Sequence, residues 1–339
     1  MAHAQPPNQP AQRTDTLTLW GGVLFSLVFT GIIWLAGSRL DSVSLLPDQG
    51  VAWYYWKLPN PTLLTRATVW GLYLAHQITI WVIIYLAQKN KLKYGNGLHK
   101  ANIYALGFNA LFIALHFVQT HFWYDGLAQD VSIFSSQGSV IVLLVWVILM
   151  ENSRRGITLG KKWPLPTDII RFARTYHGYF FAWATIYTFW YHPMISTPGH
   201  LVGFFYMFLL LLQGSLFFTR THVNKWWTFA NEVAVLIHGT LVAVMQGNGI
   251  WPMFAFGFGG IFIITQMHGL GLSRGMRLVL LFVYIGLVVW VYIARGWTYL
   301  NEIIRIPVID YIAVIVLAGI LGFGLWLAGI LKKSRQRMP

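Results

Sequence analysis

The stretch ALHFVQTHFWYDGLAQD, residues 114–130, carries His116, His121 and Asp125 within an apolar run typical of a bilayer helix. Imidazole and carboxylate groups are common protein ligands of zinc, iron and copper, and they also act as general acids and bases. Ionisable groups in a bilayer are costly and are usually functional. The stretch therefore points to a metal, cofactor or proton-handling site, which the surrounding helices must position.

Composition indicates a membrane protein. Of the 339 residues, 56% are hydrophobic and 10% are charged, whereas soluble domains carry about a quarter charged residues. The 24 Lys and Arg residues are scattered between apolar runs and form neither a basic stripe nor a binding motif, so no nucleic-acid partner is expected. Cysteine is absent, which excludes disulfides, thiolate metal sites and cysteine nucleophiles.

Ten apolar runs are long enough to cross about 30 Å of hydrocarbon. They are continuous rather than alternating, which favours helices over the strands of a β-barrel. We therefore predict an all-α polytopic integral membrane protein, a bundle of about ten transmembrane helices in a single domain over residues 17–331. Residues 1–16 are predicted to be a disordered tail and residues 332–339 a basic tail. The runs lie near 17–37, 68–88, 102–122, 133–151, 175–191, 199–219, 227–246, 249–268, 277–294 and 307–331.

The distribution of basic residues predicts the orientation. Nineteen of the 24 Lys and Arg residues lie in the tails and in the loops that share their side of the membrane. Short loops rich in Lys and Arg stay in the cytoplasm. Both termini are therefore predicted to be cytoplasmic, and the expected location is a cell membrane, with a prokaryotic inner membrane as the specific expectation.

Three histidines fall at one depth in this arrangement. His76 and His238 lie eight residues inside the outer ends of their predicted spans, and His116 lies six residues inside. At about 1.5 Å per residue, all three are roughly 9–12 Å below the outer boundary. Buried imidazole pairs are the usual axial ligands of haem b, so these three residues are the candidate cofactor ligands.

A second group of ionisable residues is predicted at the outer rim. His121 and Asp125 share a face if their helix continues that far, and the short connection HPMISTPGH keeps His192 and His200 close together. We predict that these four residues bind a transition metal such as iron, zinc or copper. His121 and Asp125 are also candidates for catalytic proton transfer, together with the intramembrane carboxylate Glu232.

Three functions remain open. The favoured hypothesis is a metal- or haem-dependent membrane oxidoreductase that acts on a lipophilic substrate (a quinone, a lipid or a pigment precursor) from the outer half of the bilayer. An alternative is a secondary transporter or proton-coupled carrier without metal. A third is a non-catalytic subunit of a larger membrane complex, in which the histidines only cap helix ends.

Gly257, Gly259 and Gly260 would permit close helix approach or leave room for a flat cofactor.

Overall fold

The computed structural model describes residues 13–47, 56–247 and 249–335, and these residues form helices and loops without a strand. Within these described ranges, eight helices are long and apolar enough to cross a bilayer. The chain is therefore an all-helical, multi-pass membrane protein, as its composition predicted. Helix α8 (Trp251–Ile264), with 14 residues, is shorter than a typical span, so the count of ten stays a prediction.

The predicted tails are largely outside the described residues. Helix α1 (Thr14–Ala36) already begins at Thr14, and helix α10 (Glu302–Arg335) continues to Arg335. The chain divides into two compact units.

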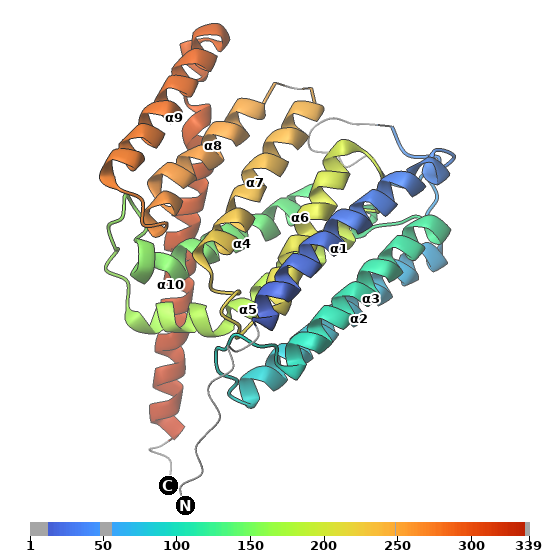
Figure 1. Ribbon diagram of the computed structural model, residues 1–339, viewed down its shortest axis with the longest axis horizontal. Helices are drawn as coiled ribbons and strands as arrows, with labels where there is room; N and C mark the ends of the chain where they lie inside the picture. Colours follow the sequence, from blue (N-terminus) through green and yellow to red (C-terminus); the bar gives the residue numbers. More distant parts are fainter. Residues whose placement is uncertain (1–12, 48–55, 248, 336–339) are drawn as a thin grey trace, which may run out of the picture. The chain divides into compact units, whose positions relative to one another are not determined.

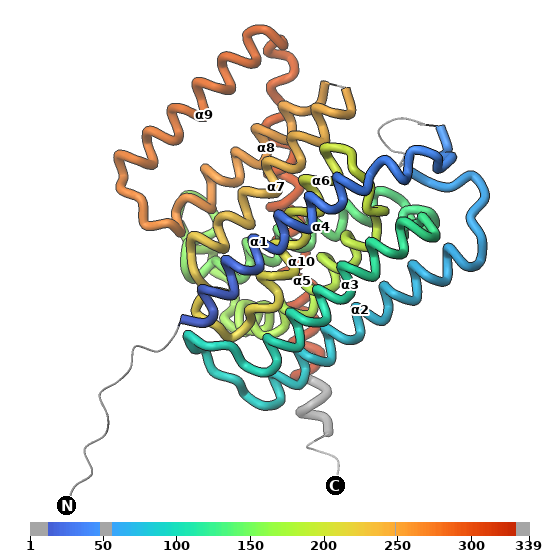
Figure 2. Tube along the Cα trace, turned by 45° about the vertical axis from the view of Figure 1, so that its right-hand side comes forward, coloured from blue at the N-terminus to red at the C-terminus, as the bar shows by residue number. Residues whose placement is uncertain are grey.

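Unit 1 contains residues up to Leu45, Lys57–Gln129 and Phe189–Thr228. Its α2 and α3 lie side by side as an antiparallel hairpin, and α6 packs against α1 and α3 (Figures 1 and 2). The end of α5 also belongs to this unit. Besides α1, the elements are α2 (Leu63–Lys89), α3 (Lys100–Trp123), the end of α5 (Thr167–Tyr191), α6 (Pro198–Ser215), and the 3-10 turns η1 (Gly37–Leu40) and η2 (Leu127–Gln129).

Two well-capped helix starts fix the registers of α2 and α6. Thr62 and Thr65 form a capping box, in which each hydroxyl accepts the backbone N–H of the other residue. At the start of α6, Thr197 accepts the N–H of His200, and Pro198 occupies the first helical turn, where its missing N–H costs nothing.

Unit 2 contains Asp130–Thr188 and the chain from Phe229 onward. Helix α10 packs against α8 and α4, and α9 packs against α8 (Figure 2). The elements are α4 (Ile133–Arg155), most of α5, α7 (Lys225–Met245) from Phe229, α8, η3 (Gln266–Gly269), α9 (Arg274–Arg295), η4 (Trp297–Tyr299) and α10.

Small residues and an ion pair hold the helices of unit 2 together. A Cβ atom at Gly257 would lie 2.9 Å from the Ile306 side chain, so only glycine permits this approach of α8 and α10. Glu302 accepts two hydrogen bonds of 2.8 Å from the Arg295 guanidinium and one of 3.1 Å from the Tyr292 hydroxyl. This clamp fixes the connection between α9 and α10.

Candidate functional site

His76 is fully buried in α2, and both of its ring nitrogens are hydrogen-bonded. The Trp190 indole N–H donates to His76 Nδ1 over 3.2 Å, so Nδ1 must be the acceptor. The proton therefore sits on Nε2, which donates to Asn109 Oδ1 over 2.7 Å. The ring also stacks on Phe112 at a centroid distance of 4.4 Å. In this arrangement His76 has no lone pair left for iron.

The hydrogen-bond chain continues from α3 into α6. Asn109 Nδ2 donates to Ser215 Oγ over 2.8 Å, and Ser215 Oγ donates to the Leu211 carbonyl over 2.8 Å. Every link has a donor and an acceptor, so the chain joins α2, α3, α6 and the end of α5. A fully satisfied buried network of this kind stabilises one helix arrangement.

His116 is equally buried but has a different environment. Its ring stacks on the Trp190 indole at 4.2 Å and 27°, with Phe189 and Phe204 at its edges. Within the residues that the structure describes, neither Nδ1 nor Nε2 of His116 has a hydrogen-bond partner. An unsatisfied buried polar group costs about 1–3 kcal/mol, so the buried His116 ring destabilises the ligand-free protein.

Gln119 adds two more unpartnered polar atoms beside His116. It lies three residues further along α3, and residues three apart are neighbours on a helix. Both side chains are fully buried. Neither Gln119 Oε1 nor Gln119 Nε2 has a partner in the described part of the chain. Four polar atoms on adjacent turns of α3 thus lack a partner among the described residues.

The connection between α5 and α6 brings two of the predicted rim histidines together. The rings of His192 and His200 meet edge to face at a centroid distance of 5.4 Å. His200 Nδ1 also lies 2.8 Å from the hydroxyl of Thr197, the residue that caps α6.

His121 and Asp125 do not share a helix face. Helix α3 ends at Trp123, and Tyr124 has a φ of +24°, so the chain turns before it reaches Asp125. His121 Nδ1 donates to the Phe117 carbonyl over 2.8 Å. Its Nε2 has no partner among residues 13–47, 56–247 and 249–335.

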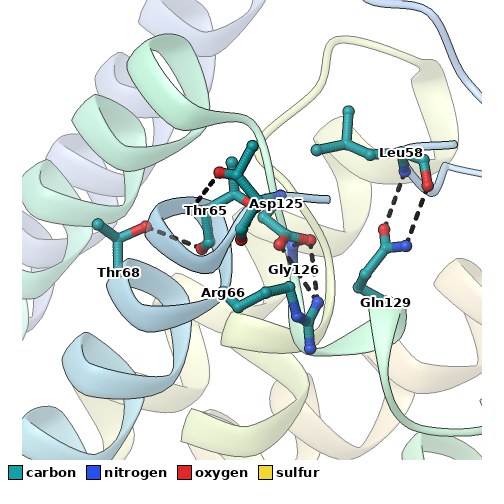
Figure 3. A network of polar contacts seen from close by, with 8 residues as sticks. Leu58, Thr65, Arg66, Thr68, Asp125, Gly126 and Gln129 are labelled. Atoms are coloured by element: carbon teal, nitrogen blue, oxygen red, sulfur yellow. Dashed lines mark hydrogen bonds and ion pairs between the residues drawn. The ribbon is translucent and has the colours of Figure 1, made fainter. Parts of the chain in front are cut away.

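Asp125 instead pairs with Arg66 at the start of α2 (Figure 3). One Arg66 nitrogen lies 3.2 Å from Asp125 Oδ2, and the Gly126 N–H donates to Oδ1 over 2.8 Å. Burial raises the pKa of the Asp125 carboxyl, and the Gly126 N–H and the Arg66 guanidinium offset part of that rise. The pair ties the end of α3 to the start of α2.

Figure 3 also shows how the segment before α2 is held. The Gln129 amide accepts the Leu58 N–H over 2.9 Å and donates to the Leu58 carbonyl over 3.0 Å. This double hydrogen bond and the Arg66 pair anchor the segments before α2 and after α3.

The remaining predicted residues, Glu232 and His238, lie on α7 in unit 2. Glu232 accepts two hydrogen bonds from Arg155 Nη1, of 3.0 and 2.8 Å. Because His76 and His116 belong to unit 1, the three-histidine tier stays a prediction.

Metal binding by the four predicted rim residues finds no support in the geometry. In the described part of the chain, no three His, Asp or Glu side chains gather closely enough to hold a metal ion. The physical reasons are the early end of α3, the Asp125–Arg66 pair and the His121 contact with its own helix backbone. Only His192 and His200 are brought together as the sequence predicted.

Three important residues were not identified from the sequence. Gln119 carried a signal, since it is a polar residue one turn from His116 on an apolar helix. Arg66 and Arg155 were counted only as charges that set the topology. Their pairing with Asp125 and Glu232 depends on which helix ends meet, and this information is not local in the sequence.

Comparisons with known proteins give no further guidance, because no family model, curated protein or solved structure matches the chain.

Proposed function

We propose that unit 1 binds a lipophilic molecule whose polar head meets His116 and Gln119 in the outer half of the bilayer. The supporting observation is the set of four buried polar atoms on α3 that lack a partner among the described residues. Ligand sites are typically apolar with a few convergent polar groups. Here the apolar part is supplied by Trp190, Phe189 and Phe204.

A quinone and its quinol fit this chemistry best. A neutral imidazole and a carboxamide each offer a donor and an acceptor. His116 and Gln119 can therefore donate to the two carbonyls of a quinone and accept from the two hydroxyls of a quinol. The flat ring would stack among the same aromatic side chains. The expected partners are thus membrane lipid and a lipophilic small molecule.

The metal- or haem-dependent oxidoreductase is a second proposal, favoured by the free nitrogens of His116. That residue could supply one imidazole to haem b or to iron, zinc or copper. The residues present fit such a group poorly. Both ring nitrogens of His76 are already hydrogen-bonded, and no three potential metal ligands lie together among the described residues. We therefore assign no reaction step to a bound metal or haem.

Two further proposals concern the setting of the protein. A prokaryotic inner membrane, with both termini cytoplasmic, is the location that the basic loops favour. A proton-coupled carrier or a subunit of a larger complex would use the same helices without a quinone at His116. Neither of these two roles gives a direct reason for the unpartnered polar atoms on α3, whereas ligand binding does.

A photoreactive quinone tests the first proposal. We expect an azido-benzoquinone with a decyl tail to label peptides of α3 or of the α5–α6 connection in protein reconstituted in lipid nanodiscs. Gln119→Leu should lower the labelling about tenfold, since each hydrogen bond of this kind contributes near 1.4 kcal/mol. Gln137→Leu, at an exposed position of α4, is the matched control.

Equal labelling of the wild type and Gln119→Leu would reject the proposed quinone site. An absorbance spectrum of the oxidised and dithionite-reduced protein, together with elemental analysis, tests the proposal of a haem or metal centre. A Soret band or about one metal per chain, lost in His116→Ala, would support a haem or metal centre. A colourless, metal-free protein purified without chelator would reject it.

A further inference from the structure

Unit 2 contains a cavity that the unit 1 site does not involve. Its volume is about 190 Å³, larger than the engineered cavity of about 150 Å³ in another protein that binds benzene. Three aromatic rings contribute to its wall, and Phe229 and Phe262 approach each other to 5.6 Å. The lining that matters here is Phe229, Glu232, Val233, Phe258, Phe262 and Gln266.

Two of the lining residues are polar. Glu232 lies two turns into α7, and Gln266 lies two residues beyond the end of α8. The rest of the wall is apolar, so the cavity suits a molecule that is mostly hydrocarbon and carries one small polar group.

The Arg155–Glu232 pair determines which polar head the cavity accepts. The side chains are 3% and 11% exposed, and both Glu232 oxygens accept from the same Arg155 nitrogen. A carboxylate has about four lone-pair positions, so acceptor capacity remains on Glu232. Arg155 already neutralises its charge, and a second anion would be repelled.

From this geometry we propose that unit 2 binds a neutral lipophilic alcohol, with its hydroxyl donating to Glu232, the first part of its hydrocarbon chain in the cavity and the rest of the chain in the bilayer. A fatty acid would place a second carboxylate against Glu232. An amine would bring an uncompensated charge into an apolar space. An alkane would leave the acceptor oxygens unused. An alcohol with a hydrocarbon chain is the class of molecule that matches both the apolar wall and the free acceptor positions of Glu232.

Photolabelling tests this site in the full chain, reconstituted in phosphatidylcholine nanodiscs. The probe is hexadecanol with a diazirine on its chain and a terminal alkyne. We expect the labelled residues to lie on α4, α7 and α8, at or beside the cavity lining. Excess unlabelled hexadecanol should suppress the labelling, whereas hexadecane and hexadecanoate should not.

Val233→Phe fills the cavity and should reduce labelling about tenfold, as expected for a bound group lost to steric exclusion. Val316→Phe, on an exposed face of α10, makes the same change without touching the cavity and should have no effect. His116→Phe should also have no effect, which keeps this site distinct from the one in unit 1.

Two results would overturn the proposal. Labelling spread evenly over the lipid-facing helices, unaffected by competitors, would show that the cavity holds no specific ligand. Suppression by hexadecane as strong as by hexadecanol would show that the hydroxyl contact with Glu232 does not exist. The competition uses the wild-type protein, so the test stands even if Val233→Phe fails to fold.

Discussion

Replacing His116 by Phe should stabilise the ligand-free protein, while the same change at His76 should destabilise it. His116 carries two buried nitrogens without a partner in the described residues, at a cost of about 1–3 kcal/mol each. Phe has a similar shape and suits the aromatic surroundings of Trp190, Phe189 and Phe204. After about 1 kcal/mol for imperfect packing, His116→Phe should gain about 1–5 kcal/mol.

His76→Phe removes two hydrogen bonds instead. It leaves the Trp190 N–H and Asn109 Oδ1 buried without their partner. Hydrogen bonds between membrane helices average below 1 kcal/mol, because the unfolded chain also finds partners in the bilayer. The two orphaned groups cost about 1–3 kcal/mol each, which brings the loss to about 2–6 kcal/mol.

Equilibrium unfolding in mixed micelles, with an increasing mole fraction of dodecyl sulfate and Trp fluorescence as the signal, measures both variants. The informative quantity is the difference between them, about 3 kcal/mol or more on the estimates above. If His116→Phe loses as much stability as His76→Phe, then the His116 nitrogens have partners in the ligand-free protein. The reasoning for the unit 1 site would then be refuted.

Three other substitutions test the structural contacts. Arg66→Gln leaves the buried Asp125 carboxylate without its ion-pair partner and should cost about 3 kcal/mol of stability at pH 7. Because loss of the cation raises the pKa of the Asp125 carboxyl further, the loss of thermal stability should shrink as the pH falls toward 5. A loss that does not change with pH would contradict this. Glu302→Gln should weaken the α9–α10 clamp by about 2 kcal/mol and speed amide hydrogen exchange around that connection; unchanged exchange would speak against it. Gly257→Ala should destabilise by about 1–3 kcal/mol through overpacking, unlike Gly21→Ala, whose Cβ meets nothing within 4 Å; equal effects in thermal unfolding would argue against close α8–α10 packing.

The fold class was predictable because the long apolar runs indicate a bilayer setting, and in a bilayer the backbone must form its own hydrogen bonds, as it does in a helix. The ends of the helices were harder to predict. The turn at Tyr124 depends on a positive φ and on the Asp125–Arg66 pair, which joins residues 59 apart in the sequence. Local composition contains no signal for such a pairing.

The closeness of His76 and His116 could be predicted better than their chemistry, and both rings do contact Trp190. The rise of about 1.5 Å per residue places His76 and His116 in one layer, but it does not fix the rotation of each helix or the residue opposite it. That rotation gives His76 the partners Asn109 and Trp190, whereas His116 meets only aromatic faces. The rotation of the helices therefore decides which histidine is structural and which is a candidate binding residue.

The most direct test of the unit 1 site is the dissociation constant of a decyl-benzoquinone, measured in nanodiscs for the wild type and His116→Phe. If His116 holds the quinone head, the dissociation constant should rise about tenfold or more, since loss of about 1.4 kcal/mol corresponds to a factor of ten. Gln137→Leu should bind like the wild type. An unchanged dissociation constant in a stably folded His116→Phe protein would contradict quinone binding at His116.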